Sequence, residues 1–172
     1  MALWRRDGFA KDAWTFLADG VPAPVDGAVV VSLKRWLGER EDLQARAAPT
    51  GVAVEAGADA QAHLAELATR PLVALAFAKF ADGRAFSYAR LLRDRHRFDG
   101  ELRAIGDVLI DEIPLMLRCG FDSFEVIDAA TLRALEIGRL PGPSIHYQPS
   151  SARDEAAKGT RALRRAAANL LG

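Results

Sequence analysis

Short apolar segments of strand length alternate with helix-like segments along most of the chain, and this alternation constrains the fold most. Residues 72–77, Leu-Val-Ala-Leu-Ala-Phe, form a continuous apolar run, which is typical of a strand buried on both faces. Similar short runs predict strands at 29–33, 51–55, 102–105 and 124–127. Strands that alternate with helices form a mostly parallel sheet, so the predicted fold class is α/β. The pattern does not distinguish an open sheet from one that curls like part of a barrel.

Helices are predicted between these strands, and their ends carry recognisable signals. Asp59, Ser87 and Asp128 are the expected N-caps, and Gly120 is the expected C-terminal glycine. Pro114 fits only the first turn of a helix, because an interior proline costs about 3 kcal/mol. The helices are therefore expected at 34–47, 59–70, 88–95, from near 112 to 119, and at 129–137.

The two ends of the chain are less regular. Before residue 28 we expect a short helix-like cluster at 12–17 and a proline- and glycine-rich link at 20–24. After the last helix, residues 144–148 alternate enough for an edge strand. We therefore expect one α/β domain over 1–150, followed by a C-terminal amphipathic helix over 151–172.

Charge and composition exclude several classes of protein. The chain of 172 residues has 23 basic and 23 acidic residues, whereas a general nucleic-acid-binding protein needs a net positive footprint. No apolar run is long enough to span a membrane, and the charged start lacks the apolar core of a signal peptide. The single cysteine suits a reducing compartment, so we expect a cytoplasmic protein.

The sequence has no motif that would identify a cofactor or a metal. Its three histidines are dispersed and it lacks His-x-x-x-His or Cys-x-x-Cys spacing, so no metal site is expected. It also lacks the glycine-rich phosphate motifs and the Gly-x-Ser-x-Gly elbow, so no nucleotide, flavin or other cofactor is expected. Cys119 lies near the end of a predicted helix, where the dipole disfavours a thiolate, and we interpret it as structural.

Two loops that follow predicted strands are the candidate site, because ligands of parallel α/β folds bind beyond the carboxyl ends of the strands. The first loop, residues 79–84, contributes Lys79, Asp82 and Arg84, which we expect to bind a small anion beside a helix start. The second, Gly106-Asp107, contributes Asp107 as a candidate catalytic acid or base. Arg103, on the strand before Asp107, is included among the anion-binding residues.

A structural interpretation of the same loops remains open. Asp82-Gly83 is a common turn sequence, and Asp107 can serve as a helix cap or as the ion-pair partner of Arg84. A catalytic interpretation requires Lys79, Arg84 and Asp107 to converge within hydrogen-bonding distance in one pocket.

Three stretches of the chain resemble the bacterial family known as domain of unknown function 934. They are Lys-Phe-Ala-Asp-Gly-Arg-Ala-Phe-Ser-Tyr-Ala-Arg from residue 79, Gly-Glu-Leu-Arg-Ala-Ile-Gly-Asp-Val-Leu from residue 100, and Arg-Cys-Gly-Phe-Asp-Ser-Phe from residue 118. The resemblance extends over roughly residues 5–148. The chain departs from the family pattern at Ala76, Ala85 and Glu112, where aspartate, glycine and glutamine are usual.

Members of the resembled family are commonly encoded beside assimilatory sulfite reductase and are often labelled as oxidoreductases of sulfite reduction. The resemblance implies an accessory protein of sulfur assimilation, with sulfite reductase or another protein of that pathway as partner. A sulfur oxyanion would suit the site at Lys79 and Arg84. Two alternatives remain open. One is an enzyme that binds a small anionic substrate through Lys79 and Arg84 and uses Asp107 as acid or base. The other is a structural subunit of a homo-oligomer, with the C-terminal helix as its interface.

Overall fold

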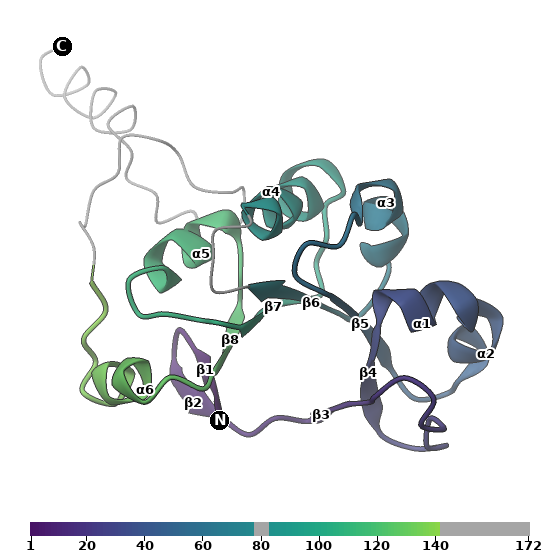
Figure 1. The fold of residues 1–172 in the computed structure, drawn as a ribbon, viewed down its shortest axis with the longest axis horizontal. Coiled ribbons are helices and arrows are strands. Elements are labelled where there is room, and N and C mark those ends of the chain that lie inside the picture. The colour runs from purple at the N-terminus through teal and green to yellow at the C-terminus, as the bar shows by residue number, and fades with distance from the viewer. Residues whose placement is uncertain (78–82, 142–172) are drawn as a thin grey trace, which may run out of the picture.

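A single curled sheet organises the molecule. The computed structural model describes residues 1–77 and 83–141, and in it an eight-stranded sheet runs in the order β2-β1-β8-β7-β6-β5-β4-β3. The pairings from β3 through β8 are parallel, whereas β1 pairs antiparallel with β8 and with β2. Figure 1 shows that this sheet bends into a half-barrel with helices around its outer side. The predicted mostly parallel α/β class is confirmed, and the sheet resembles part of a barrel.

The strands and helices have the following bounds. The strands are β1 (Ala2–Arg5), β2 (Gly8–Ala10), β3 (Trp14–Phe16), β4 (Ala28–Ser32), β5 (Thr50–Val54), β6 (Leu72–Phe77), β7 (Glu101–Gly106) and β8 (Ser123–Val126). The helices are α1 (Leu33–Gly38), α2 (Arg40–Ala45), the 3-10 turn η1 (Gln61–His63), α3 (Leu64–Leu67), α4 (Arg84–Arg90), the π-helical turn η2 (Leu91–Arg95), α5 (Ile113–Cys119) and α6 (Ala129–Glu136).

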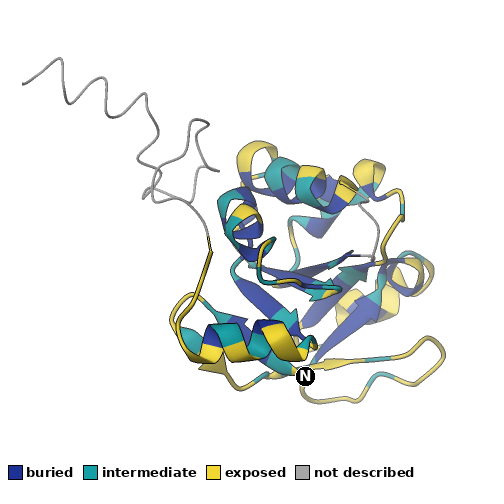
Figure 2. Ribbon diagram, turned by 60° about the vertical axis from the view of Figure 1, so that its left-hand side comes forward, coloured by how far each residue is buried: buried dark blue, intermediate teal, exposed yellow. Residues whose placement is uncertain are grey.

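The two faces of the sheet are buried in different ways, because successive residues of a strand point to opposite faces. On the outer face, Val73 and Leu75 of β6 belong to the main core, which packs under the helices. On the inner face, Val30, Leu72 and Ala74 form a second, smaller cluster. Figure 2 shows the buried strands between the partly exposed helices and the exposed chain at the open side of the curl. Burial on both faces explains why β6 is apolar throughout.

Three short strands form where the sequence predicted no sheet. The predicted helix-like cluster at 12–17 is wrong, because residues 14–16 form β3 and pair in parallel with β4. Strands β1 and β2, also in the irregular first part, lie at the opposite edge of the sheet. The chain between β2 and β3 therefore passes from one edge of the sheet to the other across the open side of the curl (Figure 1).

Three of the predicted helices differ from the structure in their bounds. The predicted helix 34–47 is two short helices that meet at Glu39, whose backbone is not helical. The predicted helix 59–70 is the shorter pair η1 and α3, although Asp59 does accept a hydrogen bond from the Gln61 amide. Ser87 is not an N-cap: α4 already begins at residue 84, because Ala85, Tyr88 and Ala89 form its buried face at helical spacing.

The last two helices begin and end as the capping signals predict. Helix α5 has Pro114 in its first turn and Gly120 in the left-handed conformation at its end. In α6, the Asp128 carboxylate accepts a hydrogen bond of 2.6 Å from the Thr131 amide. The expected edge strand at 144–148 and the expected helix over 151–172 lie outside the described residues.

Candidate functional site

Gly106 and Asp107 follow β7 at the carboxyl edge of the sheet, where they contact the end of β6. The Asp107 amide donates a hydrogen bond of 3.0 Å to the carbonyl of Phe77. Gly106 has φ +85°, and a Cβ atom at this position would lie 2.5 Å from the same carbonyl oxygen. Only glycine permits this close approach without a shift of the backbone. The carboxyl ends of β6 and β7 are thereby fixed to each other, with the half-buried Asp107 beside them.

Arg84 lies at the same carboxyl edge, at the start of α4, and its side chain helps to line a small recess. The other lining residues come from α4 and from the ends of β5 and β6: Val54, Glu55, Gly57, Ala58, Leu75, Ala76, Ala85 and Tyr88. The volume available is about 10 Å³, room for the centre of one water-sized group. Ala76 contributes a methyl group and no charge to this recess.

Tyr88 fixes the wall of this recess that follows β5. Its hydroxyl donates to the Ala58 carbonyl at 3.3 Å and accepts from the Ala60 amide at 3.3 Å. The ring is buried in the main core. One side chain of α4 therefore positions the loop that carries Glu55 relative to Arg84.

The predicted site residues are only partly assembled by the described structure. Lys79 and Asp82 lie outside the described residues. Arg84 and Asp107 both lie at the carboxyl edge of the sheet, but Asp107 does not line the recess beside Arg84. Arg103 is roughly 13 Å farther back along β7 than Asp107, since a strand rises about 3.3 Å per residue.

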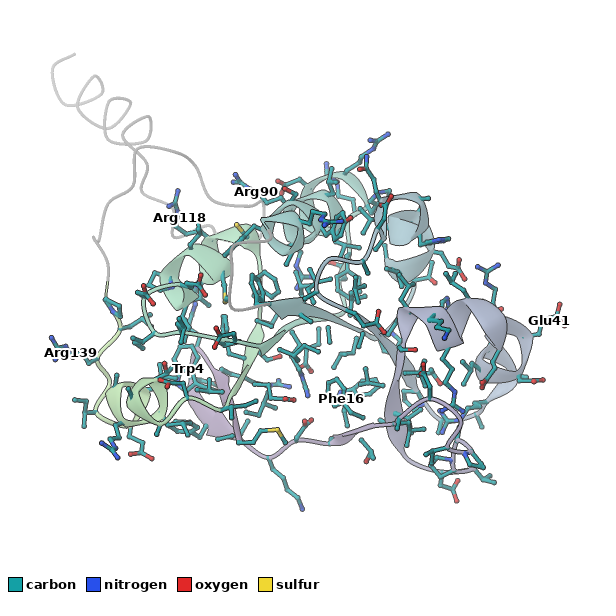
Figure 3. The ribbon with its side chains drawn as sticks, in the orientation of Figure 1. Trp4, Phe16, Glu41, Arg90, Arg118 and Arg139 are labelled. Atoms are coloured by element: carbon teal, nitrogen blue, oxygen red, sulfur yellow. The ribbon has the colours of Figure 1, made fainter. Side chains whose placement is uncertain are left out.

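Arg103 lies inside the curl of the sheet and is bound to two carboxylates. Its side chain is fully buried. It donates to Asp12 at 2.6 and 3.0 Å and to Glu101 at 2.8 and 3.1 Å. Its guanidinium also lies 5.9 Å from the ring centre of Phe16, which is on the inner side of the sheet (Figure 3). Arg103 is therefore engaged in a network within the protein, on the inner face of the sheet.

Glu101 extends this network to the neighbouring strands. Its carboxylate accepts a hydrogen bond of 2.8 Å from the Arg5 guanidinium on β1 and one of 2.6 Å from the Ser123 hydroxyl on β8. Asp12 comes from the chain that crosses the open side of the curl. The network thus connects β1, β7, β8 and the crossing segment by charge-assisted hydrogen bonds.

The network shifts the pKa values of its members. For Asp12, burial alone would raise the pKa, but hydrogen bonds from the Arg103 guanidinium and the Trp14 amide lower it below its usual value. For Arg103, burial acts to lower the pKa, and Asp12 and Glu101 together raise it. Burial raises the pKa of Glu125, on β8, although Arg103 partly offsets this effect. The ionised forms of Asp12 and Arg103 therefore stabilise each other.

Sequence reasoning missed Asp12 and Glu101 as members of a polar site. One signal was present: Glu101 and Arg103 occupy alternate positions of a strand whose other residues, Leu102 and Ala104, are apolar. Charged residues at i and i+2 of a buried strand lie on one face and require partners there. Asp12 had no comparable signal, because its contact with Arg103 spans 91 positions of the chain.

An acidic segment follows Asp107 on the way to α5. Burial raises the pKa of Glu112, and the negative charges of Asp111 and Asp107 raise it further. Among the described residues, no group of three or more histidine, cysteine or acidic side chains is placed to hold a metal ion.

Cys119, at the end of α5, is buried, and burial raises the pKa of its thiol. These features agree with our interpretation of Cys119 as a structural residue.

The curled, mostly parallel sheet with helices on its outer side defines an α/β protein of half-barrel form. The model of the family DUF934, described as a bacterial protein of unknown function, matches residues 51–157. The chain belongs to this family, as its motifs indicate. The match begins at β5 and includes the recess, Arg103 and the acidic segment, whereas Arg5 and Asp12 precede it.

Comparison with curated proteins and with solved structures found no significant match. Within residues 1–77 and 83–141, every helix is too short or too polar to cross a membrane.

Proposed function

We propose that this protein is an accessory protein of assimilatory sulfite reduction that binds a small anion at the carboxyl edge of its sheet. The connection to sulfite reduction rests on the family, whose members are commonly encoded beside assimilatory sulfite reductase. The anion site rests on one structural observation, the exposed Arg84 beside a recess at the ends of β5 and β6. A guanidinium at this edge suits an oxyanion, because its planar donors match two anionic oxygens.

The size and charge of the recess restrict its ligand. A recess that accepts one water-sized group can take a single oxygen of a sulfite, sulfate or phosphate ion. Glu55 also lines the recess and its negative charge opposes an anion, whereas Ala76 adds no charge. The proposal therefore predicts that removing the charge of Glu55 strengthens binding and that removing Arg84 weakens it.

Calorimetric titration of the protein with sulfite, sulfate and phosphate tests the site. Arg84→Ala should lower the affinity at least tenfold, because a hydrogen bond to a charged group contributes about 1.5–3 kcal/mol. Glu55→Gln should raise it, and Arg133→Ala, an equally exposed arginine on α6, should leave it unchanged. Equal effects of Arg84→Ala and Arg133→Ala would exclude a site at Arg84.

The partner is tested separately by co-purification. The tagged protein should retain sulfite reductase, or another protein of sulfur assimilation, under native conditions. A deletion strain with normal sulfite reductase activity, together with no co-purification, would refute the accessory role while leaving an anion site possible. Turnover of sulfite by the purified protein alone would favour the alternative of an enzyme, and Asp107→Asn should then abolish it.

A further inference from the structure

The segment from Asp107 to Leu115, which runs from the end of β7 into the first turn of α5, combines negative charge with exposed apolar side chains. It carries the three carboxylates of Asp107, Asp111 and Glu112. Burial raises the pKa of Glu112, and the charges of Asp111 and Asp107 raise it further. Leu109 is 37% exposed and Leu115 is 46% exposed. A basic, amphipathic segment would complement this surface, because its cations would face the three carboxylates and its apolar side chains would cover the two leucines.

This segment, which we call the acidic segment, lies against the last described helix. The Ile110 amide donates a hydrogen bond of 3.1 Å to the Thr131 hydroxyl in the first turn of α6. Figure 1 shows α5 and α6 on the same side of the molecule, and the described chain ends at Pro141 shortly after α6. The point at which the chain leaves the described structure is therefore near the acidic segment.

The remainder of the chain has the complementary composition. Residues 151–172 include five basic and two acidic residues, and Arg161, Arg164 and Arg165 follow helical spacing. The same stretch contains Leu163 and Leu170, seven positions apart. Its sequence therefore supplies positive charges that complement the carboxylates of the acidic segment and leucines that can cover Leu109 and Leu115.

We propose that the C-terminal stretch 151–172 docks on the acidic segment of its own chain. The nine residues between Pro141 and Ser151 can extend over about 30 Å, which is ample for neighbouring elements. A short connection of this kind gives a local concentration in the millimolar range, which favours the same chain over a second copy. Residues 158–172 lie beyond the matched region of the family, so this contact concerns the present chain. It does not depend on the proposed anion site.

Hydrogen–deuterium exchange on the full-length protein tests the docking. In the unmodified protein, the amides of 107–115 should exchange slowly, and R161E/R164E/R165E should accelerate their exchange. One exposed ion pair changes the docking equilibrium by at most about fivefold. The three charge reversals together should therefore accelerate exchange at 107–115 on the order of tenfold. These positions lie outside residues 1–77 and 83–141, so the substitutions remove no described contact of α5.

Restoration by the opposite charge change makes the test specific. Adding D111K/E112K to the tail variant should restore slow exchange. E41K/D42K on α2 makes the same charge change at the far side of the molecule (Figure 3) and should restore nothing. Slow exchange should be independent of protein concentration. The proposal would be overturned if the unmodified protein and the R161E/R164E/R165E variant exchanged equally, or if E41K/D42K restored slow exchange. Protection that rises with protein concentration would also overturn it, in favour of a second copy of the chain.

Discussion

Replacing Arg103 by methionine should destabilise the protein strongly, because it leaves two carboxylates facing each other inside the curl of the sheet. Arg103 is fully buried and makes four hydrogen bonds, two each to Asp12 and Glu101. Breaking a buried ion pair by removing one partner costs about 3–5 kcal/mol. The Asp12 side chain is 29% exposed and can regain water, so we expect a loss near the lower end, about 3 kcal/mol.

Urea denaturation and thermal melting measure this loss. For a chain of this size, about 3 kcal/mol corresponds to a decrease of roughly 6–12 °C in Tm. Arg40→Met, which breaks the exposed pair between Arg40 and Glu66, should cost less than about 1 kcal/mol. Both variants replace an arginine by methionine, but Arg103 is buried and Arg40 is exposed.

A double-mutant cycle separates the ion pair from the packing of Arg103. Asp12→Asn alone should cost about 1–2 kcal/mol, because it weakens a charge-assisted hydrogen bond. In the Arg103→Met background the same change should cost little or even stabilise, because it removes an uncompensated charge. If Asp12→Asn costs the same in both backgrounds, or if Arg103→Met costs less than Arg40→Met, the reasoning is refuted.

Three further outcomes are expected. The pKa of Asp12 is lower in the folded than in the unfolded state, so the ionised carboxylate stabilises the folded protein above about pH 4. This stabilisation is lost as the pH falls through the pKa of Asp12 in the folded state. Urea midpoints should therefore fall over that acid range, and they should fall less after Asp12→Asn. Gly106→Ala should lower the free energy of unfolding by at least about 2 kcal/mol, because Gly106 has a positive φ and a Cβ there would lie 2.5 Å from the Phe77 carbonyl oxygen. Gly83 has φ −65° and open space around it, so Gly83→Ala should change the free energy of unfolding by less than about 1 kcal/mol. The same denaturation assay measures both. Cys119 should react with a disulfide reagent far more slowly in the native than in the urea-unfolded protein; equal rates would contradict its burial.

The central strands could be predicted from the sequence because their pattern is local. A strand such as β6, covered on both faces, requires apolar residues at every position, and its neighbour β5 carries a shorter version of the same signal. In β7, apolar residues alternate with Glu101 and Arg103. The ends of α5 and α6 were equally predictable, since proline, glycine and aspartate act within one turn.

The strands at the two edges could not be predicted, because their residues take strand conformation through distant partners. Strand β3 has only three residues and depends on β4, and β1 depends on β8, more than 100 positions away in the chain. Within residues 12–17, Trp14, Phe16 and Leu17 alone fit a helix as well as a strand.

The positions of the candidate residues in the fold could be predicted in part, but their contacts could not. The rule that ligands bind at the carboxyl ends of parallel strands correctly placed Arg84 and Asp107 at one edge of the sheet. Arg103 shares a strand with that edge but faces Asp12, a residue that no local pattern connects to it. Long-range ion pairs of this kind depend on the curvature of the sheet, and sequence periodicity does not report curvature.

The pairing of β1 with β8 has a consequence for the order in which the molecule can form. During synthesis, Ala2–Arg5 is made before its partner Ser123–Val126, which lies more than 100 positions later in the chain. Asp12 likewise waits for Arg103. The nascent chain must therefore carry β1 unpaired, with Trp4 exposed, until β8 has been made. Closure of the curl is expected to be a late event, slowed by the separation of its two sides along the chain.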